Sequence, residues 1–266
     1  MHRIPAAPDG IRLRLAWGES VGKHRKIDER VNQKWSVMCG RYSLICIDDL
    51  GNRFRVFNPM LGARSKFNIA PGTRQPVIVQ EAGGRELVQM QWGLVSHRTK
   101  DLKTAHPIIN ARAETLAEKP SFASLLKTKR CLIPASGFFE WKHEGTKKIP
   151  FYMSVNDQPL FAFAGLYDEW HDPAGTVLAT YTIITTEPNP LMATVHNRMP
   201  VILAQEHEER WLTGESQDSG QLKAMLAPYP AEKMALHPVS PLVNVPSADD
   251  ERVIRPVVSL DGEDTQ

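Results

Sequence analysis

The sequence predicts an α+β fold with a mixed, largely antiparallel β core that is barrel-like and carries a few flanking helices. Three observations support this class. Glycine and proline account for about one residue in seven, which favours many short elements joined by turns. Seven segments are short, rich in β-branched and aromatic residues, and bounded by Gly, Pro, Asn or Asp. Helix signals are fewer, which argues against a helical bundle.

The strand candidates follow one another along the whole central part of the chain. They are residues 76–80, 87–92, 131–134, 138–142, 151–155, 160–164 and 177–185. Gly83-Gly84 predicts a hairpin turn between the first two candidates. Asn156-Asp157 predicts a turn that pairs the fifth candidate with the sixth.

Three segments are predicted to be helical. Ser121 is a candidate N-cap for residues 122–129, because its hydroxyl can accept a hydrogen bond from a backbone N–H of the first turn. A helix over residues 205–212 is expected to stop at Gly214, and another is expected over residues 221–226.

The charge divides the chain into parts of different character. Residues 1–37 contain eight Lys or Arg and four Asp or Glu, whereas the remainder contains 24 basic and 26 acidic residues. We expect residues 1–37 to be a disordered extension, and three explanations stay open: a propeptide, a tail that binds something acidic, or a mis-assigned translation start. Residues 38–248 are expected to form one domain, followed by an acidic, flexible tail over 249–266.

Composition also limits the environment and the partners of the chain. No stretch approaches the ~18 consecutive apolar residues of a membrane span, so no membrane partner is expected. Three cysteines cannot build a dense disulfide framework, which favours the cytoplasm. The Cys and His spacing does not match a zinc site, and no phosphate-loop or dinucleotide motif occurs, so neither a metal nor an organic cofactor is implied.

Cys39 follows Met38 directly and is the first candidate for chemistry. If translation starts at Met38 and the methionine is removed, Cys39 has a free α-amine of pKa near ~7.7–8.0 beside its thiol. An aldehyde would react with the amine to form a Schiff base, and the thiol would then close a five-membered thiazolidine ring. An internal cysteine has an amide nitrogen and cannot react in this way. Cys46 and Cys131, set among Leu and Ile, are expected to be small buried hydrophobes.

Two further segments carry polar groups suited to such chemistry. Asn110 could orient an amine, and Arg112 offers a planar fork for phosphate; the alternative is a surface turn and helix start. On a strand, Glu140 shares a face with Phe138, so partial desolvation would raise its pKa and suit it to proton transfer. The alternative for Glu140 is an exposed side chain on an edge strand.

A fourth segment combines a strand end with a histidine. Thr185 and Thr186 end a predicted strand and are followed by a turn, an arrangement that can bind phosphate. His196 can exchange a proton near pH 7, although a lone histidine is more often structural.

Taken together, the segments resemble one known family. Six motifs occur in its order: Met-Cys-Gly-Arg-Tyr at 38–42, Phe-Asn-Ile-Ala-Pro-Gly at 67–72, Gln-Trp-Gly-Leu-Val at 91–95, Asn-Ala-Arg-Ala-Glu at 110–114, Arg-Cys-Leu-Ile-Pro-Ala-Ser-Gly-Phe-Phe-Glu-Trp at 130–141, and His-Asn-Arg-Met-Pro at 196–200. This order is similar to that of the SRAP family, the SOS response-associated peptidases or abasic site processing proteins. The resemblance runs from residue 38 to about residue 245.

The resemblance implies a protein that shields abasic sites in single-stranded DNA by cross-linking to the sugar aldehyde. It implies that Cys39 is the nucleophile, that Asn110 orients its amine, that Glu140 shuttles protons, and that His196 assists sugar ring opening. It implies single-stranded DNA with abasic sites as the partner of a monomeric, cytoplasmic protein that associates with the nucleoid when bound to DNA. The residues expected to contact DNA are Arg41, Asn68, Pro71, Trp92, Arg112, Thr185 and Arg198, with Pro71 and Trp92 forming an exposed apolar platform for the bases.

The sequence departs from the family pattern at two places. Asn197 stands where the family usually has an aspartate, so it retains hydrogen bonding and loses the charge. Cys39 is preceded by 38 residues, and the family has been assigned an autoproteolytic activity that exposes the cysteine. Two other functions stay open: a thiol peptidase that uses Cys39, His196 and Glu140, and a non-covalent single-stranded DNA-binding module.

Overall fold

The computed structural model of the chain describes residues 39–57, 64–172, 174–214 and 219–257. The extension predicted over residues 1–37 lies outside the described residues. The tail predicted over residues 249–266 lies partly outside them as well. Within residues 249–257, the Asp249 carboxylate accepts hydrogen bonds from the backbone of Phe67 and Asn68, and Val253 is fully buried.

Five strands pair in a closed ring, so the predicted barrel-like core is confirmed. The ring is made of β3 (Arg74–Glu81), β4 (Gly84–Trp92), β6 (Arg130–Ala135), β9 (Phe161–His171) and β10 (Val177–Thr186). Each strand pairs with the next, and β10 pairs with both β9 and β4, which closes the ring. Only the β4–β10 contact in the ring is parallel, so the sheet is mixed and largely antiparallel. Closure leaves these strands without free edges.

Three short strands extend the barrel sheet toward the candidate site. They are β5 (Asn110–Arg112), β11 (Met199–Pro200) and β12 (Ile202–Leu203). β5 runs parallel to the end of β10, and β11 runs antiparallel to it, so three chain segments meet at Thr185. This junction brings the sequence motifs at 110–114, 185–186 and 196–200 together.

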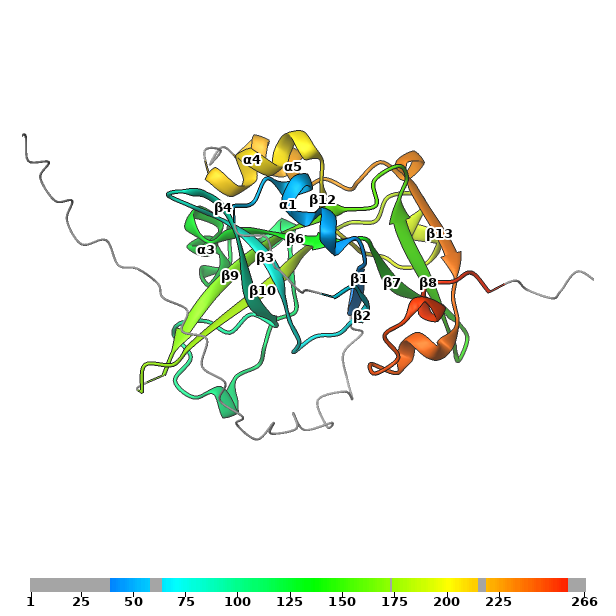
Figure 1. Ribbon diagram of the computed structural model, residues 1–266, viewed down its shortest axis with the longest axis horizontal. Helices are drawn as coiled ribbons and strands as arrows, with labels where there is room; N and C mark the ends of the chain where they lie inside the picture. The colour runs from blue at the N-terminus through cyan, green and yellow to red at the C-terminus, as the bar shows by residue number, and fades with distance from the viewer. Residues whose placement is uncertain (1–38, 58–63, 173, 215–218, 258–266) are drawn as a thin grey trace, which may run out of the picture. The chain divides into compact units, whose positions relative to one another are not determined.

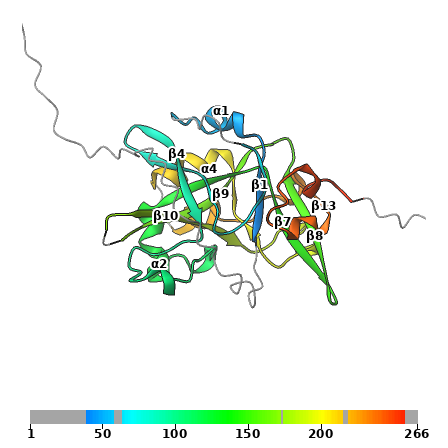
Figure 2. The same ribbon diagram turned by 60° about the horizontal axis from the view of Figure 1, so that its bottom comes forward.

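A second sheet of five strands lies beside the barrel. Its order is β13 (Met234–Pro238), β8 (Lys147–Val155), β7 (Gly137–Glu144), β1 (Arg41–Leu44) and β2 (Lys66–Ile69). Figures 1 and 2 both show β1 between the barrel strands and β7. The Tyr42 hydroxyl on β1 lies 2.8 Å from the Tyr181 hydroxyl on β10, so β1 joins the two sheets through one buried pair.

Helices are short and few, as predicted. They are α1 (Leu50–Phe54), α2 (Pro120–Ala123), α3 (Leu125–Thr128), α4 (Gln205–Thr213) and α5 (Ser219–Met225). Gly214 ends α4 in the left-handed conformation, with φ 68°, as its sequence position predicts. The expected N-cap at Ser121 is wrong, because the helix starts two residues before the predicted Phe122: Pro120 holds the first helical position and Lys119 is the N-cap.

All seven predicted strands are present, and two turn predictions had different outcomes. The β3–β4 hairpin turns at Gly83-Gly84, with Glu81 opposite Gly84. Asn156-Asp157 does form a turn, but the strands that flank it do not pair with each other. β8 pairs with β7 and β13 in the second sheet, whereas β9 belongs to the barrel. The turn therefore carries the chain from one sheet to the other.

One glycine shows how tightly the barrel is packed. A Cβ at Gly165 on β9 would lie 2.2 Å from Cδ1 of Ile133 and 2.9 Å from Sγ of Cys131. Both neighbours are fully buried, so neither has room to move. The predicted burial of Cys131 is confirmed, whereas Cys46 is only half-buried.

Candidate active site

Cys39 lies against Glu140 of β7, directly before the start of β1 in the second sheet. The antiparallel register of β1 with β7, in which Arg41 faces Phe139, carries the residues before β1 back over Glu140. The backbone nitrogen of Cys39 donates a hydrogen bond to Oε1 of Glu140. Cys39 is 3% exposed and Glu140 is 1% exposed. The site therefore holds position 39 by its nitrogen atom, next to a carboxyl group shielded from water.

Burial sets the protonation of both groups. Burial raises the pKa of Glu140 to about 7, although hydrogen bonds from Cys39 favour the charged form. Burial and the nearby Glu140 charge also raise the pKa of the Cys39 thiol well above its usual value. The positive charge of Arg198 opposes this increase, so Arg198 acts on the thiol electrostatically. At neutral pH the thiol is protonated, and the pKa of Glu140 lies close to the ambient pH. The predicted partial desolvation of Glu140 is confirmed.

Arg198 is held where β5, β10 and β11 meet. Its Nη2 atom donates to the Thr185 carbonyl oxygen at 2.7 Å and lies 3.3 Å from the Thr185 hydroxyl. Its Nη1 and Nη2 atoms also donate to the two carboxylate oxygens of Glu114, with 3.0 Å for the second bond. Thr185 is fully buried, and its hydroxyl accepts a hydrogen bond from Arg198. Glu114 belongs to a sequence motif, but no role was predicted for its side chain.

His196 stands next to Arg198 and is half-buried. Burial lowers the pKa of His196, and the positive charges of His143 and Arg198 act in the same direction. The Nδ1 atom of His196 accepts a hydrogen bond from the backbone N–H of Arg198 at 3.2 Å. This bond assigns the proton of the neutral ring to Nε2, which can donate. The adjacent Asn197 side chain is exposed.

Asn110 and Arg112 lie on β5, not on the turn and helix start that composition alone allowed. Asn110 is opposite Ile183 of β10, and Arg112 is opposite Thr185. Asn110 is half-buried, whereas Arg112 is exposed. Their alternation on a strand places the two side chains on one face, since residues two apart point the same way. A short 3₁₀ helix, η4 (Ala113–Thr115), follows and presents Glu114 to Arg198.

Two residues predicted to contact DNA, Arg41 and Asn68, make hydrogen bonds within the fold. Arg41 donates to Oδ1 of Asn68 at 2.8 Å and to the Val243 carbonyl at 2.9 Å. The Asn68 amide nitrogen lies within 3.2 Å of the carbonyl oxygens of Val243, Val245 and Ala248. We call Arg41, Asn68, Asp249 and these three carbonyls the C-terminal anchor. Asn68 is 5% exposed, so its amide is committed to holding residues 243–248.

The expectation of an exposed aromatic platform at Trp92 is wrong. Trp92 is 1% exposed, and its Nε1 donates to the Ile109 carbonyl at 3.0 Å. Its ring packs edge-on against Tyr42, with centroids 5.2 Å apart, and parallel to Tyr181 at 6.4 Å. The aromatic side chain belongs to the core because the end of β4 points into the barrel. Pro71 is half-buried in the loop before β3.

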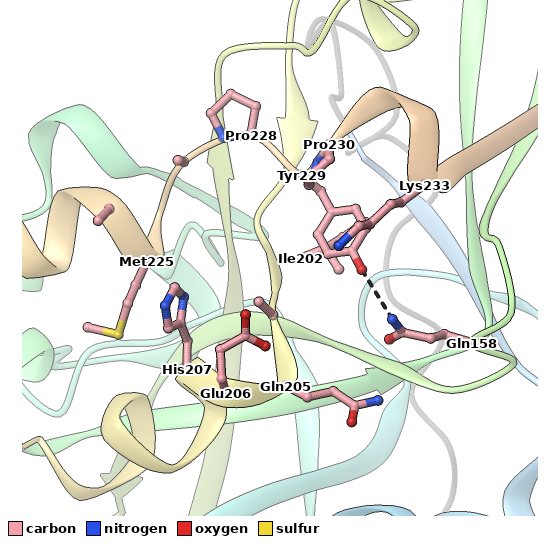
Figure 3. A pocket seen from close by; sticks show the side chains of 13 residues that line it. Gln158, Ile202, Gln205, Glu206, His207, Met225, Pro228, Tyr229, Pro230 and Lys233 are labelled. Carbon is pink, nitrogen blue, oxygen red and sulfur yellow. Dashed lines mark hydrogen bonds between the residues drawn. The ribbon is translucent and has the colours of Figure 1, made fainter.

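One cavity lies away from these residues. It has a volume of about 420 Å³ between α4, α5 and the loop around Tyr229. Figure 3 shows Glu206 and His207 from α4 at its edge and the hydrogen bond of 3.3 Å between Gln158 and Tyr229. A larger cavity of about 1040 Å³ is lined by Glu114 and thus borders the site.

The described residues hold neither a cluster of metal ligands nor a membrane-spanning helix. Within ranges 39–57, 64–172, 174–214 and 219–257, no three His, Cys, Asp or Glu side chains come together as a metal site. In the same part of the chain, no helix has the length and apolar character needed to cross a membrane.

The chain matches one known protein family over most of its length. The profile of the family described as SOS response associated peptidase (SRAP) matches residues 38–246. The chain belongs to the SRAP family. The resemblance drawn from the six sequence motifs is confirmed, and the SRAP match begins one residue before Cys39.

Relatives of this SRAP chain have been named for a DNA lesion. It is 43% identical over 221 residues to the abasic site processing protein YoqW of Bacillus subtilis, and the alignment covers 82% of this chain and 99% of that protein. It is 32% identical over 210 residues to the abasic site processing protein HMCES of Xenopus tropicalis, covering 67% and 62% of the two chains. A crystal structure of a protein from Bacteroides thetaiotaomicron superposes with a TM-score of 0.75 at 30% identity, over 83% of this SRAP chain and all of that one.

Proposed function

We propose that this protein captures abasic sites in single-stranded DNA through a covalent link to Cys39, as part of DNA damage processing. The observation that carries the proposal is the contact between the Cys39 nitrogen and the buried Glu140 carboxyl group. A carboxyl group whose pKa is near 7 can accept a proton from an amine and return it within one reaction. The names of the relatives support an abasic site as the substrate.

The reaction uses both nucleophilic atoms of Cys39. The neutral α-amine adds to the sugar aldehyde, and loss of one water gives a Schiff base. The Cys39 sulfur then adds to the Schiff-base carbon while the thiol proton passes to the nitrogen, which closes a thiazolidine ring. Glu140 lies beside both atoms and moves these protons. In sum, one aldehyde, one amine and one thiol give one thiazolidine and one water.

The neighbouring residues prepare the sugar and the phosphate. A ring-closed abasic sugar must open before its aldehyde can react, and the Nε2–H of His196 is a donor for the ring oxygen. Arg112 is exposed on β5 and Arg198 lies close to Cys39, so both are suited to contact phosphates on either side of the lesion. Asn110, on the same face of β5 as Arg112, is proposed to orient the Cys39 amine.

The proposal requires a free α-amine at Cys39, so the active form lacks the peptide bond between residues 38 and 39. A thiol peptidase would have a different requirement, because it needs a thiolate rather than an amine. Burial in the resting site keeps the Cys39 thiol protonated, which disfavours that alternative.

The test is mass spectrometry of the protein after incubation with single-stranded DNA that carries one abasic site. The 266-residue chain is compared with a chain that starts at Met38. We expect an adduct on a peptide that begins at Cys39, and its complete loss in Cys39→Ala. Cys46→Ala is the matched control, because Cys46 is a half-buried cysteine outside the site, and it should leave the adduct unchanged.

Other outcomes would identify a different function. DNA binding that survives Cys39→Ala, without any adduct from a free Cys39 terminus, would point to a non-covalent binding module. Peptide hydrolysis by a chain whose residue 39 is still acylated would point to a thiol peptidase. Cys39→Ser with a free terminus separates the two nucleophiles, because it retains the amine and loses the thiol. It should form only a Schiff base that borohydride traps.

A further inference from the structure

Glu114 occupies the atoms of Arg198 that a phosphate would need. The two carboxylate oxygens of Glu114 accept from Nη1 and Nη2 of Arg198, which is the bidentate arrangement that guanidinium groups also use for phosphate. The third nitrogen, Nε, is buried and makes no hydrogen bond within the described residues. An anion that binds Arg198 from outside must therefore use the same two nitrogens as Glu114.

The partners of Arg198 differ in how easily they can be displaced. Thr185 is fully buried in β10 and fixes one side of the guanidinium through its carbonyl and hydroxyl oxygens. The Glu114 side chain is 50% exposed, whereas that of Arg198 is 13% exposed. Glu114 also lines the cavity of about 1040 Å³, which gives its carboxylate room to turn away. Exposed ion pairs contribute at most about 1 kcal/mol to stability, so replacing Glu114 costs little.

We infer that Glu114 is a specificity-determining residue that holds the Arg198 fork until a DNA phosphate displaces its carboxylate. This inference rests on the proposed function, because it assumes that Arg198 contacts a DNA phosphate. In the free protein the Glu114 charge neutralises the cation beside Cys39, so small anions gain little by binding there. A phosphate held in place by the rest of a DNA strand is at high effective concentration and replaces the carboxylate. The displaced Glu114 then stays near Arg112. The positive charge of Arg112 also lowers the pKa of the Glu114 carboxyl group.

The test measures binding of undamaged, labelled single-stranded DNA by fluorescence anisotropy over a range of salt concentrations. Undamaged DNA has no aldehyde, so the result is independent of covalent capture. Glu114→Gln removes the competing charge and is compared with Glu118→Gln, which removes a charge four residues away at an exposed position. We expect Glu114→Gln to lower the Kd about two- to fivefold relative to Glu118→Gln.

The salt dependence gives a second readout that a structural role would not change. In both proteins, the phosphate bound by Arg198 releases cations condensed on the DNA strand. In the natural protein, the displaced Glu114 carboxylate attracts cations again, which offsets part of this release, whereas Glu114→Gln frees no carboxylate. The slope of log K against log salt should therefore be steeper in Glu114→Gln, by at most about 0.7, the value for one phosphate contact with a single strand. Glu118→Gln should have the same salt slope as the natural protein.

Two results would overturn the inference. Weaker binding by Glu114→Gln would mean that Glu114 positions Arg198 for DNA rather than competing with DNA. Equal affinities and slopes for the two glutamine variants would mean that Glu114 has no specific effect. If one of these results is found and the natural protein still binds the strand and captures an abasic site, only this inference fails. If it does neither, the proposed function fails as well.

Discussion

The C-terminal anchor and the Cys39 site are built from similar residues and use them in opposite ways. In the anchor, Arg41 and Asn68 bond to main-chain carbonyls that cannot move away. At the Cys39 site, Glu140 is buried against a nitrogen and a protonated thiol, and Arg198 bonds to an exposed carboxylate. Polar groups with fixed partners stabilise the fold, whereas groups with exchangeable partners are available for chemistry.

The largest effect on stability is expected from Asn68→Ala in the anchor. The substitution removes two N–H donors, which three carbonyls share, and the acceptor of Arg41. At about 1 kcal/mol for each of these three bonds, the free energy of unfolding should fall by about 3 kcal/mol. Urea denaturation measures this change. A loss below about 1 kcal/mol would mean that the anchor is not a stabilising element and that the comparison fails.

A smaller effect, which depends on pH, is expected from Glu140→Gln at the Cys39 site. The folded state raises the pKa of Glu140 to about 7, above its ordinary value, so its contribution to stability is fully present below the ordinary pKa. That contribution is lost as the pH rises through about 7, because the carboxylate must then be buried with its charge. Glutamine does not titrate.

Denaturation curves of the natural protein and Glu140→Gln should therefore differ in their pH dependence. Between about pH 4 and pH 8, the natural protein should lose up to about 3 kcal/mol more stability than the variant. Stability curves of the two proteins that stay parallel over this range would show that folding does not raise the pKa of Glu140. The Cys39 site would then not differ from the C-terminal anchor by burying a titrating carboxyl group.

The smallest effect is expected at Arg198, and it sharpens the comparison with Arg41. Arg41→Met should cost about 2 kcal/mol, because it leaves the buried oxygen atoms of Asn68 and Val243 without a donor. Arg198→Met should cost about 1 kcal/mol, because water solvates Glu114 and only Thr185 loses a buried partner. DNA affinity should change in the opposite order, with the larger loss for Arg198→Met. Equal losses of stability and equal losses of DNA affinity in the two variants would contradict the proposed difference between Arg41 and Arg198.

Much of the fold could be predicted from local patterns. The seven central strands and the turn at Gly83-Gly84 follow from alternating apolar residues and turn residues, which act over short distances. The short strands β1, β2 and β5 were not predicted, because three or four residues carry too little pattern. The partner of β8 was also predicted wrongly at Asn156-Asp157, since a turn does not specify whether its two strands share a sheet.

For the candidate site, the sequence by itself determined the family and the nucleophile candidate Cys39, because motif order is a property of the chain. Strand alternation placed Glu140 on the face of Phe138, and the tertiary structure decided that this face is buried. Only the tertiary structure decided how each arginine and aromatic is used. Trp92 lies in the core because β4 closes the barrel, and Arg41 is bound by the Val243 carbonyl, 202 residues away. Glu114 meets Arg198 across 84 residues because β5 and β11 both pair with β10. Such partners are set by long-range strand pairing, which no local segment of the sequence encodes.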